Sequence, residues 1–342
     1  MAQKMALGPA RSFGEAIAVQ PLSSHTYAAN LRKEWCIGTV PNGGYVASAF
    51  FNVARTHMRQ THPTMHNGRA DPITMHLTFL RRTETGPATF SVTDTKLGAR
   101  TSTLHITLSQ NDRNGGVREE VAGYITVSNF DTEDGPSMVT GFNLTPAPAP
   151  GGDGSTPVDL ARLVRDGKDG TWSRFEVPFT SLRTASRQIE IYTPREMEKV
   201  RRGFVEQWVR FKPYGQVSRW TDETLGFLVD MFPMMLETFD TKPWKGAGQR
   251  EEKDELRKYW YPTVLLNVEF KKRLPKEGVE WLYSRVHTKM LENGRMDLDI
   301  VVLDQAGDIV ALSNHVALVV GAERNTSERG SNGNGNAKPN KL

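Results

Sequence analysis

Residues 72–79 read PITMHLTF and residues 263–270 read TVLLNVEF, and in both segments apolar side chains occupy every second position. A period of two is typical of a strand with one buried face. Each segment ends in a Phe that is closely followed by basic residues, and the alternating positions correspond one to one: Ile73, Met75, Leu77 and Phe79 match Val264, Leu266, Val268 and Phe270. The two segments therefore predict the same strand in two copies of one unit.

The similarity continues downstream, over residues 72–110 and 263–305. A turn with glycine follows each first strand, a strand with a Thr-Lys pair comes next, and from Arg100 and Arg295 onward the copies align without gaps. Each copy then closes with one more strand after an Asn/Gly-rich or Ala-Gly-Asp turn, at residues 121–128 and 309–320. Repetition of this kind predicts two copies of a four-stranded antiparallel meander.

One helix is expected upstream of each strand set, at residues 45–58 and about 222–239, and both segments are apolar on nearly every side. A helix of that composition is surrounded by other structure. We therefore predict an α+β fold in which a curved antiparallel sheet wraps round a central helix, twice in tandem. A strand is also expected before each helix, at residues 14–19 in the first copy and at 188–192 or 207–211 in the second.

These elements divide the chain into a series of predicted parts. Residues 146–154 are rich in Pro, Ala and Gly, which is typical of a linker, and the chain from residue 325 is rich in Asn, Gly and Ser. The predicted division is an N-terminal extension at 1–11, a first domain at 12–131, a linker at 132–185, a second domain at 186–322 and a disordered tail at 323–342.

The composition excludes several classes of protein. The formal net charge of +4 is too small to indicate nucleic acid binding, and no apolar run reaches the length of a membrane span. Cys36 is the single cysteine, so no internal disulfide is possible and a reducing, cytoplasmic location is expected. The chain ends in Asn340-Lys341-Leu342, one residue away from the Ser-Lys-Leu peroxisomal address, so a peroxisomal location stays open.

Asp230 is the one charged residue inside the apolar run of the second predicted helix, three residues before Pro233, which should kink or end that helix. A buried carboxylate must be paired, hydrogen-bonded or protonated, and such residues are candidates for functional sites. The alternative is an Asp230 that faces solvent or forms a plain salt bridge. Thr263 opens a predicted strand, and His315 lies in the last apolar strand. Taken alone, each residue is as consistent with a structural role as with a catalytic one.

No cofactor is expected. His57, His62 and His66 lie at a predicted helix end and the following loop, without a cysteine partner and without the spacing of metal ligands. No phosphate-binding loop, dinucleotide fingerprint or Gly-x-Ser-x-Gly elbow is present.

These features together resemble a known family, the double-hotdog thioesterases of the acyl-CoA thioesterase II type, which includes peroxisomal members and thioesterase-like proteins of fungi. The resemblance covers roughly residues 12–131 and 200–322. It rests on the following segments: 35–49, where Pro-Asn-Gly-Gly-Tyr-Val opens the first helix, then 75–82, 97–102, 225–230, 263–270 and 309–320.

The resemblance implies a catalytic set on the second copy. In that family an Asp on the second hotdog helix, a Thr or Ser on the next strand and a Gln on the last strand hold the hydrolytic water. Asp230 and Thr263 match the first two positions, and His315 stands where the family has Gln. That departure either keeps the hydrogen bond, adds a base or signals a changed reaction, and the long charged segment 244–257 is expected to form a lid or an interface.

The first helix is expected to contribute to substrate binding. Its opening residues are Asn42, Gly43, Gly44 and Tyr45, and backbone N–H groups at a helix N-terminus can stabilise an oxyanion. Gly43 and Gly44 permit the close approach of a ligand, or alternatively the tight packing of the helix.

The resulting hypothesis is a thioesterase that hydrolyses acyl-CoA or acyl-carrier thioesters, in fatty acid or secondary metabolism, through a water activated by Asp230, Thr263 and His315. Two alternatives stay open. The first is a hotdog hydratase or dehydratase, for which the Asp-x-Asn-Pro-x-His arrangement is absent. The second is a non-hydrolytic acyl-binding protein in a secondary-metabolite pathway. A homo-oligomer also stays open, whereas nucleic acid and membrane partners are not expected.

Overall fold

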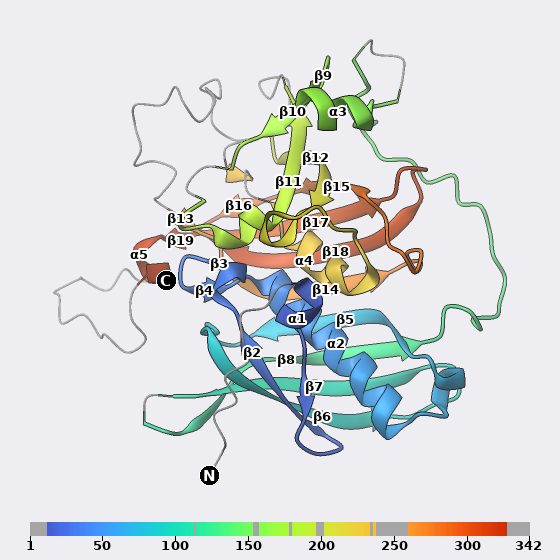
Figure 1. The fold of residues 1–342 in the computed structure, drawn as a ribbon, viewed down its shortest axis with the longest axis vertical. Coiled ribbons are helices and arrows are strands. Elements are labelled where there is room, and N and C mark those ends of the chain that lie inside the picture. The colour runs from blue at the N-terminus through green and yellow to red at the C-terminus, as the bar shows by residue number, and fades with distance from the viewer. Residues whose placement is uncertain are drawn as a thin grey trace.

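The computed structural model describes residues 12–112, 114–152, 157–177, 180–195, 202–232, 235–236 and 259–326 (Figure 1). Among these residues, the helices are α1 (Phe13–Ala16), α2 (Gly43–Thr61), α3 (Leu160–Asp166), α4 (Leu225–Val229) and α5 (Glu323–Thr326). Short 3-10 turns occur at Lys33–Trp35, Met65–Gly68, Thr184–Gln188, Pro213–Gly215 and Asp222–Thr224.

Most of the described strands belong to one antiparallel sheet. Its first half runs in the spatial order β1 (Gln20–Pro21), β2 (Thr26–Leu31), β6 (Gly86–Lys96), β7 (Ser102–Asn111), β8 (Val117–Ser128) and β5 (Asp71–Phe79). The second half continues with β14 (Thr263–Phe270), β18 (Ile309–Leu318), β17 (Arg295–Leu303), β15 (Trp281–His287), β12 (Phe204–Phe211), β11 (Ile189–Pro194), β10 (Trp172–Phe175) and β9 (Lys168–Asp169), and β16 (Leu291–Glu292) pairs with β17. Two small ribbons pair β13 (Tyr259–Trp260) with β19 (Val320–Gly321) and β3 (Cys36–Ile37) with β4 (Val40–Pro41).

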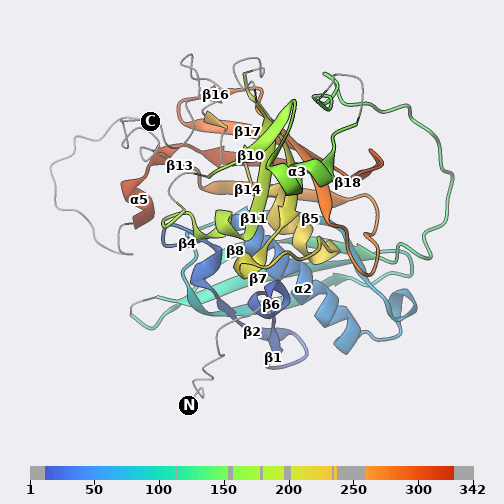
Figure 2. The same cartoon turned by 45° about the horizontal axis from the view of Figure 1, so that its top comes forward.

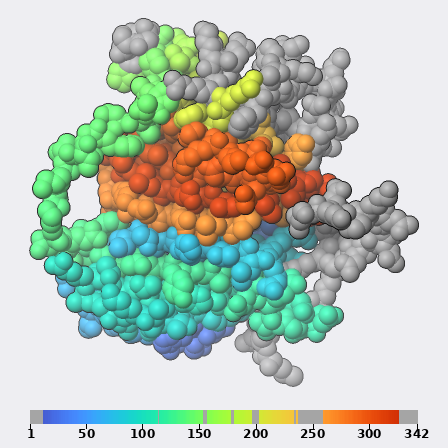
Figure 3. Space-filling view, turned by 180° about the vertical axis from the view of Figure 1, so that it is seen from behind, coloured from blue at the N-terminus to red at the C-terminus, as the bar shows by residue number. Residues whose placement is uncertain are grey.

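The two predicted repeats are present and meet edge to edge, where β5 pairs with β14. The spatial order β2-β6-β7-β8-β5 in the first half is the same as β12-β15-β17-β18-β14 in the second. Leu77 lies opposite Leu266, and Met75 lies opposite Val268. Because Met75 corresponds to Leu266 and Leu77 to Val268 in the repeat, the two pairs are the same contact made from either copy. The halves are therefore related by an internal twofold, and Figure 3 shows their two bands of colour meeting along this seam.

Helix α2 confirms the first predicted helix, and its start is fixed by a side chain. The Asn42 side chain accepts a hydrogen bond from Tyr45 N at 3.0 Å and so caps one of the free N–H groups at the helix N-terminus. The helix packs on β5, β7 and β8, with apolar residues such as Val46, Phe50 and Val53 fully buried. Figure 2 shows it enclosed between the curved sheet and the elements of the second half.

The second predicted helix is wrong in extent. Among the described residues of this segment, the α-helix is confined to α4, residues 225–229, and the 3-10 turn at 222–224 precedes it. Met231, Phe232 and Met235 are buried but not in a regular α-helix. The apolar run therefore indicates that the segment is buried, but it does not indicate how far the helix extends. Pro233, Met234 and residues 237–239 lie outside the described residues.

The strand predicted at residues 14–19 is also wrong. Residues 13–16 form α1, whose N-terminus is capped by the Ser12 side chain accepting from Glu15 N at 3.2 Å. The strand that precedes α2 in the sheet is β2 instead. In the second copy both alternatives are strands, β11 and β12, and they pair with each other.

The predicted linker contains structure of its own. Residues 132–152 cross the outside of the molecule (Figure 1), and α3, β9 and β10 then extend the sheet beyond β11. Trp172 of β10 and Leu163 of α3 are fully buried in a second apolar cluster with Trp281 and Tyr283. Residues 323–326, the start of the predicted tail, form α5, in which Asn325 is buried. The division into domains stays a prediction.

Among the described residues, no helix combines the length and the apolarity that crossing a membrane requires. Cys36 is free and buried, and burial raises the pKa of its thiol to about 12. A thiol with so high a pKa holds little thiolate near neutral pH, so Cys36 is not a nucleophile here.

Candidate active site

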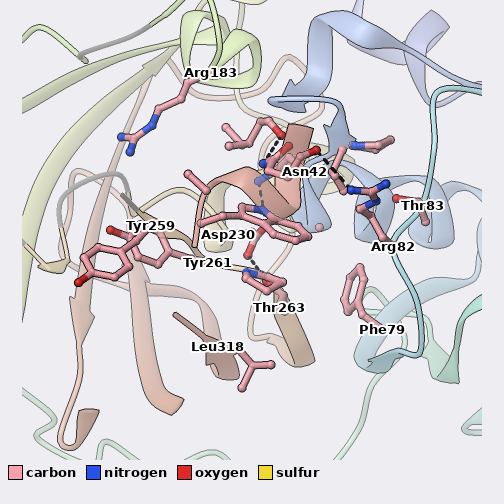
Figure 4. Close-up of a pocket in the computed structure, with 18 of the residues that line it drawn as sticks. Asn42, Phe79, Arg82, Thr83, Arg183, Asp230, Tyr259, Tyr261, Thr263 and Leu318 are labelled. Atoms are coloured by element: carbon pink, nitrogen blue, oxygen red, sulfur yellow. Dashed lines mark hydrogen bonds between the residues drawn. The ribbon is translucent and has the colours of Figure 1, made fainter. Parts of the chain in front are cut away.

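A cavity of about 320 Å³ lies where the N-terminus of α2, the C-terminus of α4 and the start of β14 converge (Figure 4). This volume is in the range typical of small-molecule sites. Asn42, Gly43, Asp230 and Thr263 supply polar groups to its wall. Much of the remaining wall is apolar or aromatic and includes Ile37, Val40, Phe79, Leu182, Phe232, Tyr259, Trp260, Tyr261 and Leu318.

Asp230 is the buried centre of the polar wall. Its Oδ2 accepts hydrogen bonds from Asn42 Nδ2 at 2.8 Å and from Gly44 N at 2.9 Å. Its Oδ1 accepts a hydrogen bond from Thr263 Oγ1 at 3.0 Å. Asp230 belongs to the second repeat, but its carboxylate is bound at the N-terminus of α2, the helix of the first repeat. The N–H groups and the dipole of a helix favour a negative charge at this end. The solvent-exposed alternative for Asp230 is excluded.

Asn42 connects the fold to this site. Because its Oδ1 caps α2 by accepting from Tyr45 N, its Nδ2 is turned toward Asp230 Oδ2. The cap therefore selects which end of the amide faces the carboxylate. Asn42 was predicted as a substrate-binding residue, and the structure places it both on the cavity wall and in contact with Asp230.

Gly44 allows the two helices to touch at the site. A Cβ atom at this position would lie 2.5 Å from Gly226 O and 2.7 Å from Asp230 Cβ. At Gly43 the corresponding distance to Asp230 Oδ2 is 3.0 Å. Gly44 therefore serves the close packing of α2 on α4, which was one of the two roles considered for it. Its N–H is already used by Asp230, so it is not a free donor for an oxyanion.

Gly44→Ala should separate α2 from α4. Because the added methyl group would overlap backbone atoms of α4, we expect the free energy of unfolding to fall by about 1–3 kcal/mol. Chemical denaturation measures this change. The matched control is Gly14→Ala in α1, where the nearest atom to an added Cβ is 4.0 Å away, so stability should hold or rise slightly. Equal effects of the two substitutions would contradict the packing role of Gly44.

His315 lies behind Asp230 and not on the cavity wall. It is fully buried, and its Nδ1 is 3.6 Å from Asp230 Oδ1, which is too long for a hydrogen bond. Its Nε2 is 2.9 Å from Ser313 Oγ, and that hydroxyl donates to Asn267 O at 2.6 Å. Since the hydroxyl hydrogen is used there, Nε2 carries the imidazole hydrogen and Nδ1 presents a lone pair toward Asp230.

Burial shifts both of these groups toward their neutral forms. It raises the pKa of Asp230 to about 6, although the hydrogen bonds from Gly44, Thr263 and Asn42 act in the opposite direction. Burial lowers the pKa of His315 to about 3, so the imidazole is neutral near pH 7. The site therefore pairs a carboxylate that can gain a proton near neutral pH with an imidazole that stays uncharged.

The predicted residues separate into three groups. Asp230, Thr263, Asn42 and Gly43 meet at the cavity, and Gly44 and His315 contact Asp230 from behind it. Tyr45 is fully buried and does not line the cavity, and its hydroxyl donates to Ala16 O at 2.7 Å. Tyr45 thus belongs to the core beneath the helix start.

The sequence interpretation missed much of the cavity wall. Arg81, Arg82 and Arg183 line it, and Figure 4 shows Arg82 and Arg183 on either side of Asp230. Arg81 and Arg82 are the basic residues that follow the first repeated strand, and their position in the sequence does not mark them as part of a site. Arg183 lies in the predicted linker, outside both repeats, so comparison of the repeats could not identify it. The charged segment 244–257, predicted as a lid or an interface, lies outside the described residues.

The continuous sheet built from two repeats, with a central helix in the first and a short helix in the second, defines a double hotdog. Solved structures share this fold. A conserved protein of unknown function with a hot dog fold from Alicyclobacillus acidocaldarius superposes with a TM-score of 0.65 at 16% identity, covering 91% of this chain and 98% of its own. The acyl-CoA thioesterase II TesB2 from Mycobacterium marinum superposes with a TM-score of 0.56 at 16% identity, with the same coverage of both chains.

Sequence comparison identifies the family. Residues 31–128 match the family model of the acyl-CoA thioesterase N-terminal domain, and residues 153–319 match that of the C-terminal domain. The thioesterase-like protein TwmA of Talaromyces wortmannii is 36% identical over 355 aligned positions, covering 96% of this chain and 98% of that protein. The chain belongs to the acyl-CoA thioesterase family.

Proposed function

We propose that this protein hydrolyses acyl thioesters, with coenzyme A or an acyl carrier as the leaving thiol, and that Asp230 is the general base. The observation that carries the proposal is the buried Asp230 carboxylate on the cavity wall, held by Asn42, Gly44 and Thr263. A base with a pKa of about 6 is ionised at neutral pH and still accepts a proton readily. The family and the 36% identical thioesterase-like relative support the reaction class.

The reaction begins with a water held at Asp230 Oδ1 and Thr263 Oγ1. Asp230 takes one proton from this water as its oxygen attacks the thioester carbonyl. The tetrahedral intermediate then collapses with cleavage of the C–S bond, and the leaving thiolate takes up the proton that Asp230 accepted, which restores the carboxylate. Both side chains line the cavity, so a thioester there can reach the water that they hold.

His315 acts in this scheme as a positioning residue. Its neutral imidazole presents Nδ1 toward Asp230 Oδ1 from behind, at 3.6 Å. Once Asp230 has taken the proton, the carboxyl O–H can donate to this nitrogen after a small shift. The His in the family's Gln position would then stabilise the protonated acid rather than touch the water.

The cavity wall suits an acyl chain next to an anionic carrier. Phe79, Phe232 and the aromatic residues 259–261 offer apolar surface for the acyl group. The guanidinium groups of Arg82 and Arg183 suit the phosphates of coenzyme A or of a phosphopantetheine arm. The expected cytoplasmic or peroxisomal location stays a prediction, since residues 327–342 lie outside the described residues.

A panel of acyl-CoA substrates, with release of free thiol as the readout, tests the proposal. Wild-type protein should release thiol from at least one acyl-CoA and form the free acid in equal amount. A hydratase or dehydratase would change the absorbance of an enoyl-CoA without releasing thiol. A non-hydrolytic binder would retain intact acyl-CoA. Either of these last two results would overturn the proposal.

The pH dependence of kcat/KM should follow the ionisation of the Asp230 carboxyl group. The base works only when ionised, so activity should be half-maximal near its pKa of about 6, approach the full value about one pH unit higher, and fall about tenfold per pH unit well below the pKa. Circular dichroism over the same range separates this loss from unfolding. A rate that stays constant well below pH 6 would exclude Asp230 as the titrating base.

His315→Gln should shift this profile rather than abolish activity. A Gln amide can donate to Asp230 Oδ1, where the imidazole presents a lone pair. That donor stabilises the carboxylate and lowers the pKa of Asp230, so the acidic limb should move down by about one pH unit. At neutral pH, where Asp230 is ionised in both proteins, turnover should fall only a few-fold, because the variant loses the acceptor for the protonated acid but keeps the base. A loss of more than about tenfold at every pH in a folded variant, or an acidic limb that does not move, would contradict the positioning role.

A further inference from the structure

A second cluster of titratable side chains lies at the opposite end of α2 from Asp230. Three histidines surround the carboxylate of Asp94 on β6: His57 Nε2 is 2.9 Å from Oδ1, and His62 Nε2 and His25 Nε2 are 2.8 and 3.1 Å from Oδ2. His57 lies in the last turns of α2, His62 caps that helix, and His25 precedes β2. Residues distant in sequence thus converge on one carboxylate.

The outer nitrogens of two of these histidines are also fixed. His57 Nδ1 lies 3.0 Å from the carbonyl oxygen of Ser24, and His25 Nδ1 lies 2.8 Å from Ser24 Oγ. Partners of this kind, a carbonyl above all, orient the rings of metal-binding histidines and fix their tautomer. A carbonyl only accepts, so a hydrogen on His57 Nδ1 satisfies that contact and leaves a lone pair on Nε2.

That arrangement leaves an unfavourable contact unless a cation lies in it. A bare Nε2 of neutral His57 would face a carboxylate oxygen at 2.9 Å, and both atoms are acceptors. Either an additional proton or a metal ion would remove the repulsion. His57 is fully buried, and a buried position disfavours a charged imidazole.

We propose that His25, His57, His62 and Asp94 form a binding site for a divalent transition metal ion of the Zn²⁺ type. Imidazole nitrogens and a carboxylate are ligands that Zn²⁺ takes in tetrahedral sites. The ligand atoms of His25, His57 and Asp94 all lie within 4.8 Å of one another. A tetrahedral Zn²⁺ site holds its ligand atoms about 3.3 Å apart. The contacts to Asp94, at 2.8–3.1 Å, would therefore lengthen by a few tenths of an ångström, and ligand atoms that lie farther apart, up to 4.8 Å, would move together.

The role of such an ion would be structural. About 13 residues of α2 separate Gly44 from His57, which places the cluster roughly 20 Å from Asp230. The ion would tie the C-terminal end of α2 to β6 and to the turn before β2. The His25 side chain is 43% exposed, so an ion can reach the cluster from solvent. The proposal is independent of the reaction proposed for the cavity.

Metal titration of the full-length protein tests this site. Protein without a histidine tag, stripped with EDTA and dialysed near neutral pH, should take up one Zn²⁺ per chain in calorimetry and show a higher Tm with Zn²⁺. Asp94→Asn and His25→Gln should each weaken binding by at least about tenfold and reduce the rise in Tm. The control, His76→Gln on the exposed face of β5, should bind as the wild type does.

The metal-free alternative is a hydrogen-bonded cluster in which Tyr27, whose hydroxyl is 3.0 Å from His57 Nδ1, donates to that nitrogen and each Nε2–H donates to Asp94. No stoichiometric uptake by wild-type protein would favour this cluster and overturn the proposal. Uptake that His25→Gln and Asp94→Asn leave unchanged would also overturn it, because the ion would then bind elsewhere. His25 is partly exposed, so its variant keeps the test valid if Asp94→Asn does not fold.

Discussion

Asp230→Asn is expected to lower kcat for thioester hydrolysis by about 10²–10⁴-fold, because it removes the general base. The variant should still fold. Its amide oxygen can accept the hydrogen bonds of Asn42 Nδ2 and Gly44 N, and its NH₂ group can donate to Thr263 Oγ1 in place of accepting from it. Initial rates of thiol release, with circular dichroism to verify folding, measure the effect.

A second aspartate in the same helical segment provides the matched control. Asp222 begins the 3-10 turn before α4, accepts a hydrogen bond from Leu274 N at 2.8 Å and has a pKa that burial also raises. It does not line the cavity. Asp222→Asn should therefore keep turnover close to that of the wild type. Similar losses in both variants would indicate a structural effect of the segment and would contradict the assignment of Asp230 as the base.

Thr263→Val has the second largest expected effect. The substitution preserves the shape of the side chain but removes the hydroxyl that donates to Asp230 Oδ1 at 3.0 Å and helps to hold the water. A hydrogen bond to a charged group contributes about 1.5–3 kcal/mol, so kcat should fall by roughly 10–100-fold. Steady-state kinetics on the best acyl-CoA of the panel provides the measurement.

Thr263→Ser separates the hydroxyl from the methyl group. Because it retains the donor, it should keep most of the activity that Thr263→Val loses. The pKa of Asp230 should also rise in Thr263→Val, since one stabilising hydrogen bond is lost, and the acidic limb of the rate profile should move to higher pH. Equal activity of the Val and Ser variants would show that the hydroxyl has no part in the reaction.

The fold could be predicted largely from two strands. The alternation over residues 72–79 and 263–270 identified β5 and β14, and their matched downstream segments identified the remaining meander strands. Period-two patterns are reliable here because one face of each strand packs on the core and the other does not. The additional strands β9 and β10 do not belong to the repeat, so comparison of the two copies could not reveal them.

The second helix shows where such patterns fail. Apart from Asp230, residues 225–236 are all apolar or glycine, and periodicity cannot distinguish a buried helix from buried irregular chain. The α-helix ends at Val229, and Asp230 occupies its C-cap position, from which its side chain reaches the start of α2. The acid that seemed to interrupt a helix in fact stands where the helix ends.

Asp230, Thr263 and His315 could be nominated from the sequence, but their arrangement could not, and their catalytic roles stay a prediction. Asp230 was identified from the cost of burying a carboxylate, and Thr263 and His315 only from the family resemblance. The contact between Asn42 and Asp230 spans 188 positions in the sequence and depends on the packing of α2 against α4. His315 lies behind Asp230 and directs the lone pair of its Nδ1 toward that residue. This orientation depends on hydrogen bonds through Ser313 and Asn267, and no sequence motif marks either of them.

The most direct test of a water activated by Asp230 is a single turnover in ¹⁸O-labelled water, followed by mass spectrometry of the acid and of the protein. The predicted result is one ¹⁸O atom in the released acid and none in the peptide that contains Asp230. Label in the Asp230 carboxylate would show that this group attacks the thioester itself. That result would contradict its role as the base.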